Sequence, residues 1–272
     1  MSNTADSPLG KSAAYEKKYN PGLLYAIPRK LNRDEIGVPV PVPFNGCDIW
    51  NAYEISWLTP KGKPQVAIGT CIFPCTTSNI IESKSFKLYL NSFNGTVFSS
   101  KDEVVHALTN DLSSAANGSV AVTLFTPEEF INLQISNWEG VNIDELDIET
   151  DCYNVNRGYL QSAGAIVHET LVSDLLKSNC LVTGQPDWAS IHIEYEGPKI
   201  DHAGLLKYLI SFRDHNEFHE QCVERIFMDI KEQCAPLKLT VYARYTRRGG
   251  LDINPFRSTE ASKPQNCRLP RQ

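Results

Sequence analysis

Two stretches of this chain repeat one another, and this internal duplication constrains the fold more than any other feature of the sequence. Residues 62–67 (GKPQVA) align with residues 184–189 (GQPDWA), and residues 89–93 (YLNSF) align with residues 208–212 (YLISF). The two matches occur in the same order and at nearly the same offset. They indicate that one supersecondary unit is duplicated, so we expect two similar modules.

The first copy has the pattern of a hairpin followed by two helices. Two segments rich in β-branched and aromatic residues flank the turn sequence TPKG at residues 59–62. Ser100 is the predicted N-cap of the second helix, and Glu103 would complete a capping box. The predicted elements are strands at 53–57 and 65–73, helices at 83–93 and 101–115, and a strand at 120–125.

The second copy shows the same order of patterns. Its predicted elements are strands near Leu181 and over 188–195, helices over 202–212 and 217–234, and a strand over 237–245. Ahead of both copies, the Val-Pro alternation of residues 38–43 favours extended chain. We therefore expect an α+β fold with an N-terminal arm over residues 1–44, a first module over 45–145 and a second over 146–272.

The positions at which the copies differ indicate where chemistry is carried. Cys180 of the second copy aligns with Leu58 of the first. Asp187 aligns with Gln65, so the first copy cannot support a reaction that needs both a thiol and a carboxylic acid. The first copy instead has ESKS at residues 82–85, where the second has DHAG. Each copy keeps polar residues that the other lacks, which predicts one composite site built from both.

The composition favours a partner that is a small molecule. With 272 residues, of which 42% are hydrophobic, the chain can bury a substantial core. The net charge of -6 and the short basic clusters argue against extended contact with nucleic acid. No apolar run is long enough to span a membrane, and the polar N-terminus lacks a secretion signal. We expect a cytoplasmic protein whose eight cysteines are reduced and mostly buried.

Cys180 and Asp187 are the candidates for covalent chemistry. The turn sequence GQP at residues 184–186 separates them, and a hairpin-like reversal there would bring thiol and carboxyl near the same substrate. A thiolate attacks electrophilic carbon when nearby positive charge or amide dipoles lower its pKa. A buried structural thiol followed by an aspartate in a turn would have the same spacing.

The densest polar cluster is the string HNEFHEQC, which begins at His215. On a helix, His215, His219 and Cys222 would share a face, as zinc ligands do. The metalloprotease pattern and a second ligand pair are missing, so no metal is predicted. A helix N-terminus with capping acids explains Glu217 but neither His219 nor Glu220. The Glu220 carboxylate is a suitable acceptor for the two adjacent N–H groups of a guanine-like edge.

Two further motifs have competing interpretations. The string RRGG at residues 247–250 suits phosphate binding through guanidinium groups and backbone amides, but a basic turn at the end of a strand explains it equally well. There is no Gly-rich dinucleotide fingerprint after a strand and no P-loop, so a dinucleotide would bind outside a Rossmann fold. Cys71 and Cys75 lie on a predicted strand and are expected in the core.

Four motifs together closely resemble the QueF-type 7-cyano-7-deazaguanine reductases of queuosine biosynthesis. They are ESKSFKLY at residues 82–89, the segment from Cys180 to TGQPD at 183–187, His219-Glu220, and Arg248-Gly249-Gly250. The first string is highly specific, and the resemblance covers nearly the whole chain after the arm. It is to the longer, two-module branch, with the Glu-Ser-Lys string in the first half and the Cys/Asp pair in the second.

The resemblance implies tandem tunnelling-fold (T-fold) modules, each an antiparallel sheet with two helices on one face, in a homodimer. It implies that NADPH reduces the nitrile of a small deazapurine to a primary amine, without direct contact with nucleic acid or membrane. Cys180 would attack the nitrile carbon to form a thioimidate. Asp187 would protonate the nitrogen. Independently of the resemblance, the position of Trp188 directly after Asp187 predicts an apolar wall beside that carboxyl group. The implied binding residues are Ile81, Glu82, Ser83, His219 and Glu220 for the substrate, and Ser83, Lys84, Arg248 and Gly249 for NADPH.

Two other functions fit parts of the pattern. A cysteine hydrolase with Cys180 as nucleophile and His219 as base would act on an amide or nitrile without NADPH. A non-catalytic purine- or pterin-binding module would use Cys180 only for packing, so Cys180→Ala would change neither ligand affinity nor activity. The reductase is favoured because four separate motifs agree with it.

Overall fold

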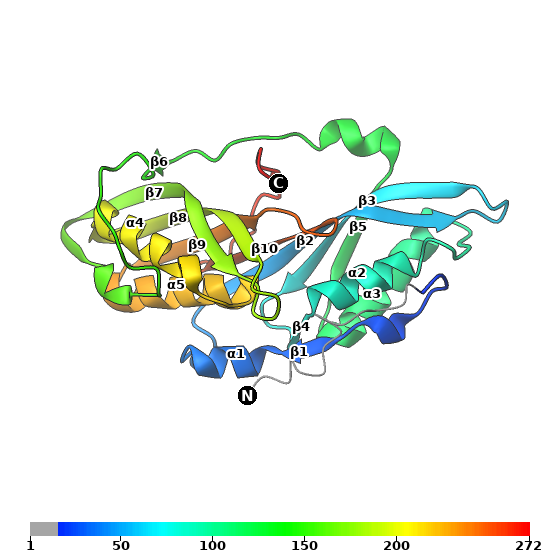
Figure 1. Cartoon of the computed structure of the whole chain (residues 1–272), viewed down its shortest axis with the longest axis horizontal. Helices are drawn as coiled ribbons and strands as arrows, with labels where there is room; N and C mark the ends of the chain where they lie inside the picture. Colours follow the sequence, from blue (N-terminus) through cyan, green and yellow to red (C-terminus); the bar gives the residue numbers. More distant parts are fainter. Residues whose placement is uncertain (1–15) are drawn as a thin grey trace. The chain divides into compact units, whose positions relative to one another are not determined.

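A long antiparallel hairpin opens the first repeat, as its β-branched and aromatic residues predict. In the computed structural model, which describes residues 16–272, strands β2 (Asn45–Leu58) and β3 (Pro64–Pro74) pair along most of their lengths (Figure 1). Gly62 in the turn between them has φ +76°, a conformation that glycine adopts without strain. The ladder continues beyond the predicted ranges because backbone pairing also takes in residues without strong β propensity.

Two helices follow the hairpin and pack against it. They are α2 (Ser83–Asn91) and α3 (Lys101–Ala116), with strand β4 (Asn79–Ile81) before them and β5 (Ala121–Phe125) after them. β5 pairs with β3, so the strand order is β5-β3-β2. Apolar side chains of the hairpin and both helices form one buried cluster, which includes Trp50, Phe73, Phe86, Phe93 and Leu108.

The N-terminus of α3 is capped nearly as predicted. The Ser100 hydroxyl accepts a hydrogen bond from the Glu103 N–H at 3.2 Å. The Glu103 carboxylate accepts from the N–H of Ser99 rather than from that of Ser100. The predicted capping box is therefore only half formed, because the Glu103 side chain bonds to the N–H of Ser99 and not to that of the N-cap residue Ser100.

The second repeat has the same order of elements as the first. Strands β7 (Ser162–Asn179) and β8 (Pro186–Ile200) form a hairpin, α4 (His202–Ile210) and α5 (His219–Cys234) follow, and β9 (Lys238–Tyr245) pairs back onto β8. Thus the third strand of each repeat joins the second strand, β5 to β3 and β9 to β8. The expected repeat of a hairpin, two helices and a third strand is observed, although the first strand of the second hairpin lies earlier in the sequence than expected.

Several strands differ from the sequence expectation. The strand predicted near Leu181 is wrong, because Leu181 lies in the turn after β7. β7 was missed because glycine, histidine and acidic residues interrupt its apolar pattern, and much of its first half is exposed. β10 (Leu251–Ser258) was missed because Asp252, Asn254 and Pro255 disfavour strands, yet all of its residues are buried.

The described chain forms two compact units whose boundaries differ from the predicted modules. The first contains the described residues up to Glu35, with Cys47–Gln134 and Arg247–Ile253. The second contains Ile36–Gly46, Ile135–Thr246 and Asn254–Gln272. The first unit therefore ends before residue 145 and takes in a short segment from near the other end of the sequence. The predicted modules were continuous stretches of sequence, so they could not place Arg247–Ile253 in the first unit.

The segment predicted as an arm contains regular structure where it is described. β1 (Ala26–Pro28) pairs with β4, and α1 (Arg29–Glu35) follows it directly. Arg29 is buried and bonded to Asp48 at 2.5 Å, which ties this segment to β2. Residues 1–15 of the predicted arm lie outside the described residues. The remaining short elements are β6 (Val141–Asn142), which runs parallel to β7, and 3-10 turns at Pro21–Leu23, Pro127–Asn132, Arg157–Tyr159 and Ser211–Asp214.

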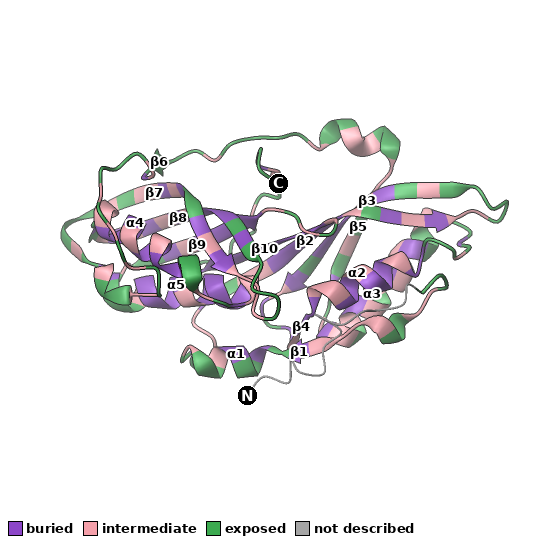
Figure 2. Ribbon diagram, in the orientation of Figure 1, coloured by how far each residue is buried: buried purple, intermediate pink, exposed green. Residues whose placement is uncertain are grey.

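In the second unit α4 contacts β7, and α5 contacts β8 and β9. Buried residues make up most of β9 and of α5, whereas much of the first half of β7 is exposed (Figure 2). All eight cysteines are free thiols; Cys71, Cys75, Cys222 and Cys234 are buried and the other four are half-buried, so the expectation that most are buried holds for only half of them. No helix within residues 16–272 combines the length and apolarity needed to cross a membrane.

Candidate active site

Cys180 lies in the tight turn that joins β7 to β8. Its backbone N–H donates to the Gln185 carbonyl at 2.8 Å, and its own carbonyl accepts from the Gly184 N–H at 3.0 Å. Gly184 has φ +66°, which an L-residue with a side chain adopts only with strain. The half-buried thiol is thus held by a fixed backbone and remains partly open to solvent.

This turn is one residue longer than its equivalent in the first repeat. Five residues, 59–63, separate the paired Leu58 and Pro64, whereas six residues, 180–185, separate the paired Asn179 and Pro186. In the alignment of the two repeats Cys180 is equivalent to Leu58, which is the last residue of β2. The structure places Cys180 within the turn, where no strand ladder restricts access to the sulfur.

Asp187 follows this turn on β8 and is buried, with 3% of its surface exposed. Its Oδ1 lies 3.8 Å from Nε2 of His219, the first residue of α5. The His219 ring meets the Tyr245 ring edge to face, with centroids 4.1 Å apart. Strand β8, helix α5 and strand β9 thus bring together a carboxyl group, an imidazole and an aromatic wall.

Trp188 does not supply the apolar wall that the sequence suggested. Neighbouring residues on a strand point to opposite faces, and Trp188 is exposed while Asp187 is buried. The Arg213 guanidinium lies over the Trp188 ring at 5.5 Å from its centroid. Tyr245 is the aromatic residue on the His219 side instead.

A second segment holds the nucleophile turn from its other side. The Asn179 N–H donates to the His215 carbonyl at 2.8 Å, and the Glu217 N–H donates to the Asn179 carbonyl at 3.1 Å. Glu217 is buried, and its carboxylate accepts a hydrogen bond from Arg225 Nε at 2.8 Å. The ion pair therefore fixes the segment bonded to Asn179, the residue before Cys180.

Helix α5 begins later than predicted, and its first residues have different roles from those expected. It begins at His219, so Glu217 precedes the helix and pairs with Arg225 rather than capping it. Cys222 is fully buried, which raises the pKa of its thiol and keeps it protonated. Within residues 16–272, no group of three or more His, Cys, Asp and Glu side chains is arranged to hold a metal ion.

Glu82 is the N-cap of α2 and is almost completely buried. Its carboxylate accepts the N–H groups of Lys84 at 2.7 Å and Ser85 at 2.8 Å. Burial raises the pKa of Glu82, and these two hydrogen bonds oppose the rise. Asp201, its counterpart in the second repeat, caps α4 in the same way. A carboxylate offers about four acceptor positions, so capping leaves room for a ligand N–H.

The RRGG string forms the turn between β9 and β10. Gly249 and Gly250 have φ +57° and +77°, and the Gly250 carbonyl accepts from the Tyr53 N–H at 2.9 Å. A Cβ atom at Gly250 would lie 2.5 Å from the Glu54 carboxyl carbon. Lys87 of α2 forms an ion pair with the same carboxylate. The turn and helix α2 therefore meet at Glu54.

The two elements that carry the residues expected to bind NADPH, helix α2 and the RRGG turn, both reach Glu54. Lys84 lies one helical turn before Lys87, and Arg248 and Gly249 directly precede Gly250. Ammonium and guanidinium groups and the amides of a turn with positive φ are suited to phosphate oxygens. The donors present here fit the phosphates of a dinucleotide.

The predicted site residues are divided between the two units. Ile81 ends β4 and Glu220 lies in the first turn of α5, and both are buried. The first unit contains Ile81, Glu82, Ser83, Lys84, Arg248 and Gly249. The second contains Cys180, Asp187, His219 and Glu220.

Comparison with known proteins places this arrangement in a family. A model described as "Nitrile reductase, 7-cyano-7-deazaguanine-reductase N-term" matches residues 15–124, and one described as "QueF-like protein" matches residues 186–264. A protein of Burkholderia thailandensis named NADPH-dependent 7-cyano-7-deazaguanine reductase is 56% identical over 273 residues, covering 99% of this chain and 100% of that protein. The chain belongs to the 7-cyano-7-deazaguanine reductase family. The family resemblance inferred from four motifs is confirmed.

Other members of the 7-cyano-7-deazaguanine reductase family are similar along their whole length. The protein of this name from Ralstonia nicotianae is 56% identical over 277 residues, covering 100% of both chains. Among solved structures, the apo form of the archaeosine synthase QueF-Like aligns with a TM-score of 0.31 and 16% identity, covering 37% of this chain and 99% of that one.

Several residues around the reductase motifs were missed by the sequence analysis. Tyr245 ends a predicted strand, so the sequence did indicate an aromatic ring at that end of the strand. Glu54 gave no signal, because its partner Lys87 lies on a separate element. The pairing of Glu217 with Arg225 gave none either, because Glu217 precedes the helix that carries Arg225.

Proposed function

We propose that this protein reduces the nitrile of 7-cyano-7-deazaguanine to the primary amine of 7-aminomethyl-7-deazaguanine with NADPH, a reaction of queuosine biosynthesis. Membership of the reductase family supports this reaction. The observation that carries the proposal is the β7–β8 turn, where a half-buried thiol at Cys180 is followed by the buried Asp187 beside His219.

Cys180 is the nucleophile in this proposal. Its thiolate sulfur bonds to the nitrile carbon, and one C–N π bond breaks as its electron pair moves to nitrogen. The product of this step is a thioimidate, which holds the reacting carbon in place. The position of Cys180 in a turn favours the attack, because the sulfur is partly accessible and the backbone around it is fixed by two hydrogen bonds.

Asp187 is the proton donor. A nitrile is a weak electrophile, so attack at carbon needs a proton at nitrogen, and general acid help of this kind contributes about 10²–10⁴ in rate. Asp187 is buried at the start of β8, next to the turn that carries Cys180. His219 lies beside that carboxyl group, with its Nε2 3.8 Å from Oδ1. The bond to sulfur breaks later, so Cys180 leaves as the thiolate and an imine remains.

The remaining predicted residues bind the two reactants. When bound, two NADPH molecules in turn would each supply one hydride, the first to the thioimidate carbon and the second to the imine carbon. Lys84, Arg248 and the backbone at Gly249 hold phosphate groups, together with Ser83. Buried carboxylates are suited to the N–H edge of a deazaguanine. The proposed substrate-binding residues are Ile81, Glu82, Ser83, His219 and Glu220.

The wider setting also follows from the family resemblance. We propose that each repeat is a T-fold module and that the active enzyme is a cytoplasmic homodimer that does not bind nucleic acid directly. The repeated hairpin, two helices and third strand support the modular part of this proposal. Light scattering of the purified protein tests the dimer.

A direct assay tests the reaction. Purified protein is mixed with 7-cyano-7-deazaguanine and NADPH, cofactor oxidation is followed, and the protein is weighed intact. We expect about two NADPH consumed per amine formed, and an adduct of substrate mass that is absent in Cys180→Ala. Cys152→Ala, which removes another half-buried thiol, is the matched control and keeps activity.

The outcome distinguishes the reductase from the two alternative functions. Turnover without NADPH would identify a cysteine hydrolase. Unchanged activity and ligand affinity in Cys180→Ala would identify a binding module in which that thiol only packs. An adduct on a different cysteine would overturn the site assignment.

A further inference from the structure

Gln272 is a buried polar residue whose side-chain amide makes four hydrogen bonds. Its side chain is 6% exposed. The amide oxygen accepts from Arg244 Nε at 2.8 Å and from the Leu269 N–H at 3.0 Å. The amide nitrogen donates to the Tyr245 carbonyl at 3.0 Å and to Asn254 Oδ1 at 2.8 Å. Such satisfied buried networks fix one geometry, because losing any member leaves a buried group unpaired.

Three of these residues form a closed ring of hydrogen bonds at the end of β9. Asn254 Oδ1 accepts from the Tyr245 N–H at 3.2 Å as well as from Gln272. Gln272 then donates to the Tyr245 carbonyl, which completes the ring. In an antiparallel ladder both backbone groups of a residue point to the same neighbouring strand. At Tyr245, the last residue of β9, the backbone N–H and carbonyl instead bond to the side chains of Asn254 and Gln272.

Tyr245 connects this ring to the proposed catalytic groups. Its backbone is held by Asn254 and Gln272, and its ring packs edge to face on His219 with centroids 4.1 Å apart. His219 in turn lies 3.8 Å from the Asp187 carboxylate. A shift of the Tyr245 backbone therefore moves the surface against which His219 rests.

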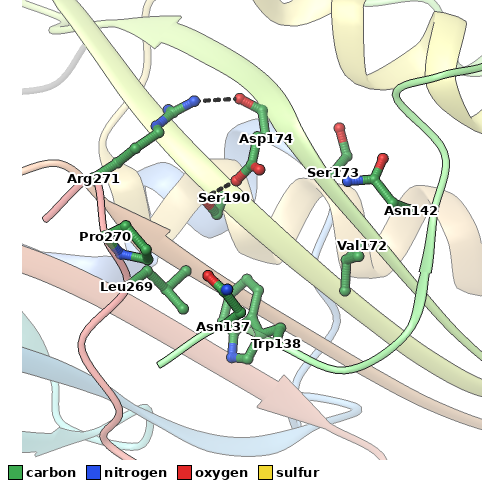
Figure 3. Close-up of a pocket in the computed structure, with 10 residues that line it drawn as sticks. All are labelled: Asn137, Trp138, Asn142, Val172, Ser173, Asp174, Ser190, Leu269, Pro270 and Arg271. Atoms are coloured by element: carbon green, nitrogen blue, oxygen red, sulfur yellow. Dashed lines mark hydrogen bonds between the residues drawn. The ribbon is translucent and has the colours of Figure 1, made fainter. Parts of the chain in front are cut away.

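The segment that carries Gln272 is seated on the second unit by contacts of its own. Leu269, Pro270 and Arg271 line one side of a pocket, together with residues of β7 and β8 (Figure 3). Arg271 Nη1 donates to the Asp174 carbonyl at 2.8 Å, away from Tyr245. This bond seats the segment independently, so the role of Gln272 can be separated from the attachment of the segment as a whole.

We propose that Gln272 is a positioning residue for the reduction: it fixes the backbone of Tyr245 and thereby the place of His219 beside Asp187. This inference rests on the proposed roles of His219 and Asp187. It assigns a function in the reaction to a residue far from the motifs in sequence, and it requires no contact between Gln272 and substrate.

The decisive variant is Gln272→Glu. A carboxylate keeps the acceptor for Arg244 and the Leu269 N–H, but it has no N–H to give to Tyr245 or Asn254. We expect kcat to fall about tenfold or more, because sub-ångström displacement of reacting groups is costly. The KM for NADPH should stay within about twofold of wild type, since binding energy is not altered. The pH profile of kcat should shift, because the distance between His219 and Asp187 sets their mutual influence.

Gln272→Met and Arg271→Ala complete the experiment. Gln272→Met keeps the volume without hydrogen bonds and should reproduce the loss in kcat. Arg271→Ala is the matched control: it loosens the same segment at Asp174, and it should keep the wild-type kcat and pH profile. Thermal unfolding of each variant shows that the enzyme assayed is folded.

The results separate this inference from the proposed function. If both Gln272 variants keep the wild-type kcat and pH profile, Gln272 is not a positioning residue. If Arg271→Ala loses as much activity as they do, the segment acts only as structural support and the inference is equally overturned. If Asp187→Asn retains full activity, the proposed acid is wrong, and that result is independent of both Gln272 variants.

Discussion

The imidazole of His219 lies 3.8 Å from the carboxylate of Asp187, Nε2 to Oδ1, although 31 residues separate them in the chain. The hairpin turn sets Asp187 at the start of β8, and the first turn of α5 brings His219 to it. The carboxyl group is buried while the neighbouring Cys180 is partly accessible. This combination suits a reaction in which sulfur attacks and a protected acid supplies the proton.

Asp187→Asn should separate binding from chemistry. The amide keeps the size of the side chain but is not an acid, so we expect kcat to fall by about 10²–10⁴-fold. Substrate affinity, measured by calorimetry without NADPH, should change little. Asp174→Asn, on the exposed part of β7, is the control and should retain activity. A rate near wild type in Asp187→Asn would exclude the acid role.

The thiols should differ sharply in reactivity. Cys71 is 1% exposed, and burial raises its pKa to about 12, so at about pH 8 it stays protonated and sealed from reagent. Cys180 is partly accessible in its turn. Iodoacetamide followed by peptide mass mapping should show modification of Cys180 without Cys71, and activity should decline in step with it. Labelling of Cys71 in the folded protein would contradict its placement in the core.

Glu82 should make folding stability depend on pH. Burial raises its pKa above the ordinary value of 4.5, so the folded state holds the proton more tightly than the unfolded chain does. As pH rises from about 4.5 through the raised pKa, the unfolded state releases its proton first and the folded state loses stability. Glu82→Gln removes this loss. Urea unfolding over that range should show a smaller decline for the variant; parallel curves would count against a perturbed carboxyl at this position.

Gly250 and Gly62 offer a matched pair of substitutions in the first unit. Their φ angles are +77° and +76°, so alanine is strained at both by about 1–2 kcal/mol. Only at Gly250 does the added carbon meet another group, 2.5 Å from the Glu54 carboxyl carbon. Gly250→Ala should lose slightly more stability in urea unfolding than Gly62→Ala does, because the flexible Glu54 carboxylate must move aside and give up its ion pair with Lys87.

The same pair tests the cofactor site. Because Arg248 and Gly249 share the turn with Gly250, Gly250→Ala should raise the KM for NADPH about tenfold, which corresponds to about 1.4 kcal/mol of binding. Gly62→Ala should leave that KM unchanged. Equal KM values for the two variants would move the cofactor away from the RRGG turn.

Elements with strong periodicity were predictable from the sequence. The hairpin, α2, α3, α4 and β9 lie where the patterns put them, because local propensity and burial agree there. β10 was not predictable, since Asp252, Asn254 and Pro255 are poor strand residues that are buried only because side chains distant in sequence bond to them. The hydrogen bond from Asn51 to Asp252 is one such contact.

The sequence by itself determined the duplication, the family and the identity of the candidate catalytic groups, because these depend on residue types and their order along the chain. Only the tertiary structure decided that Cys180 lies in a turn, that Glu82 caps a helix, and that Tyr245 is held by Gln272. The reason is physical: hydrogen bonds and burial join residues by their positions in space, and nothing in the spacing of Tyr245 and Gln272 along the chain indicates that they meet.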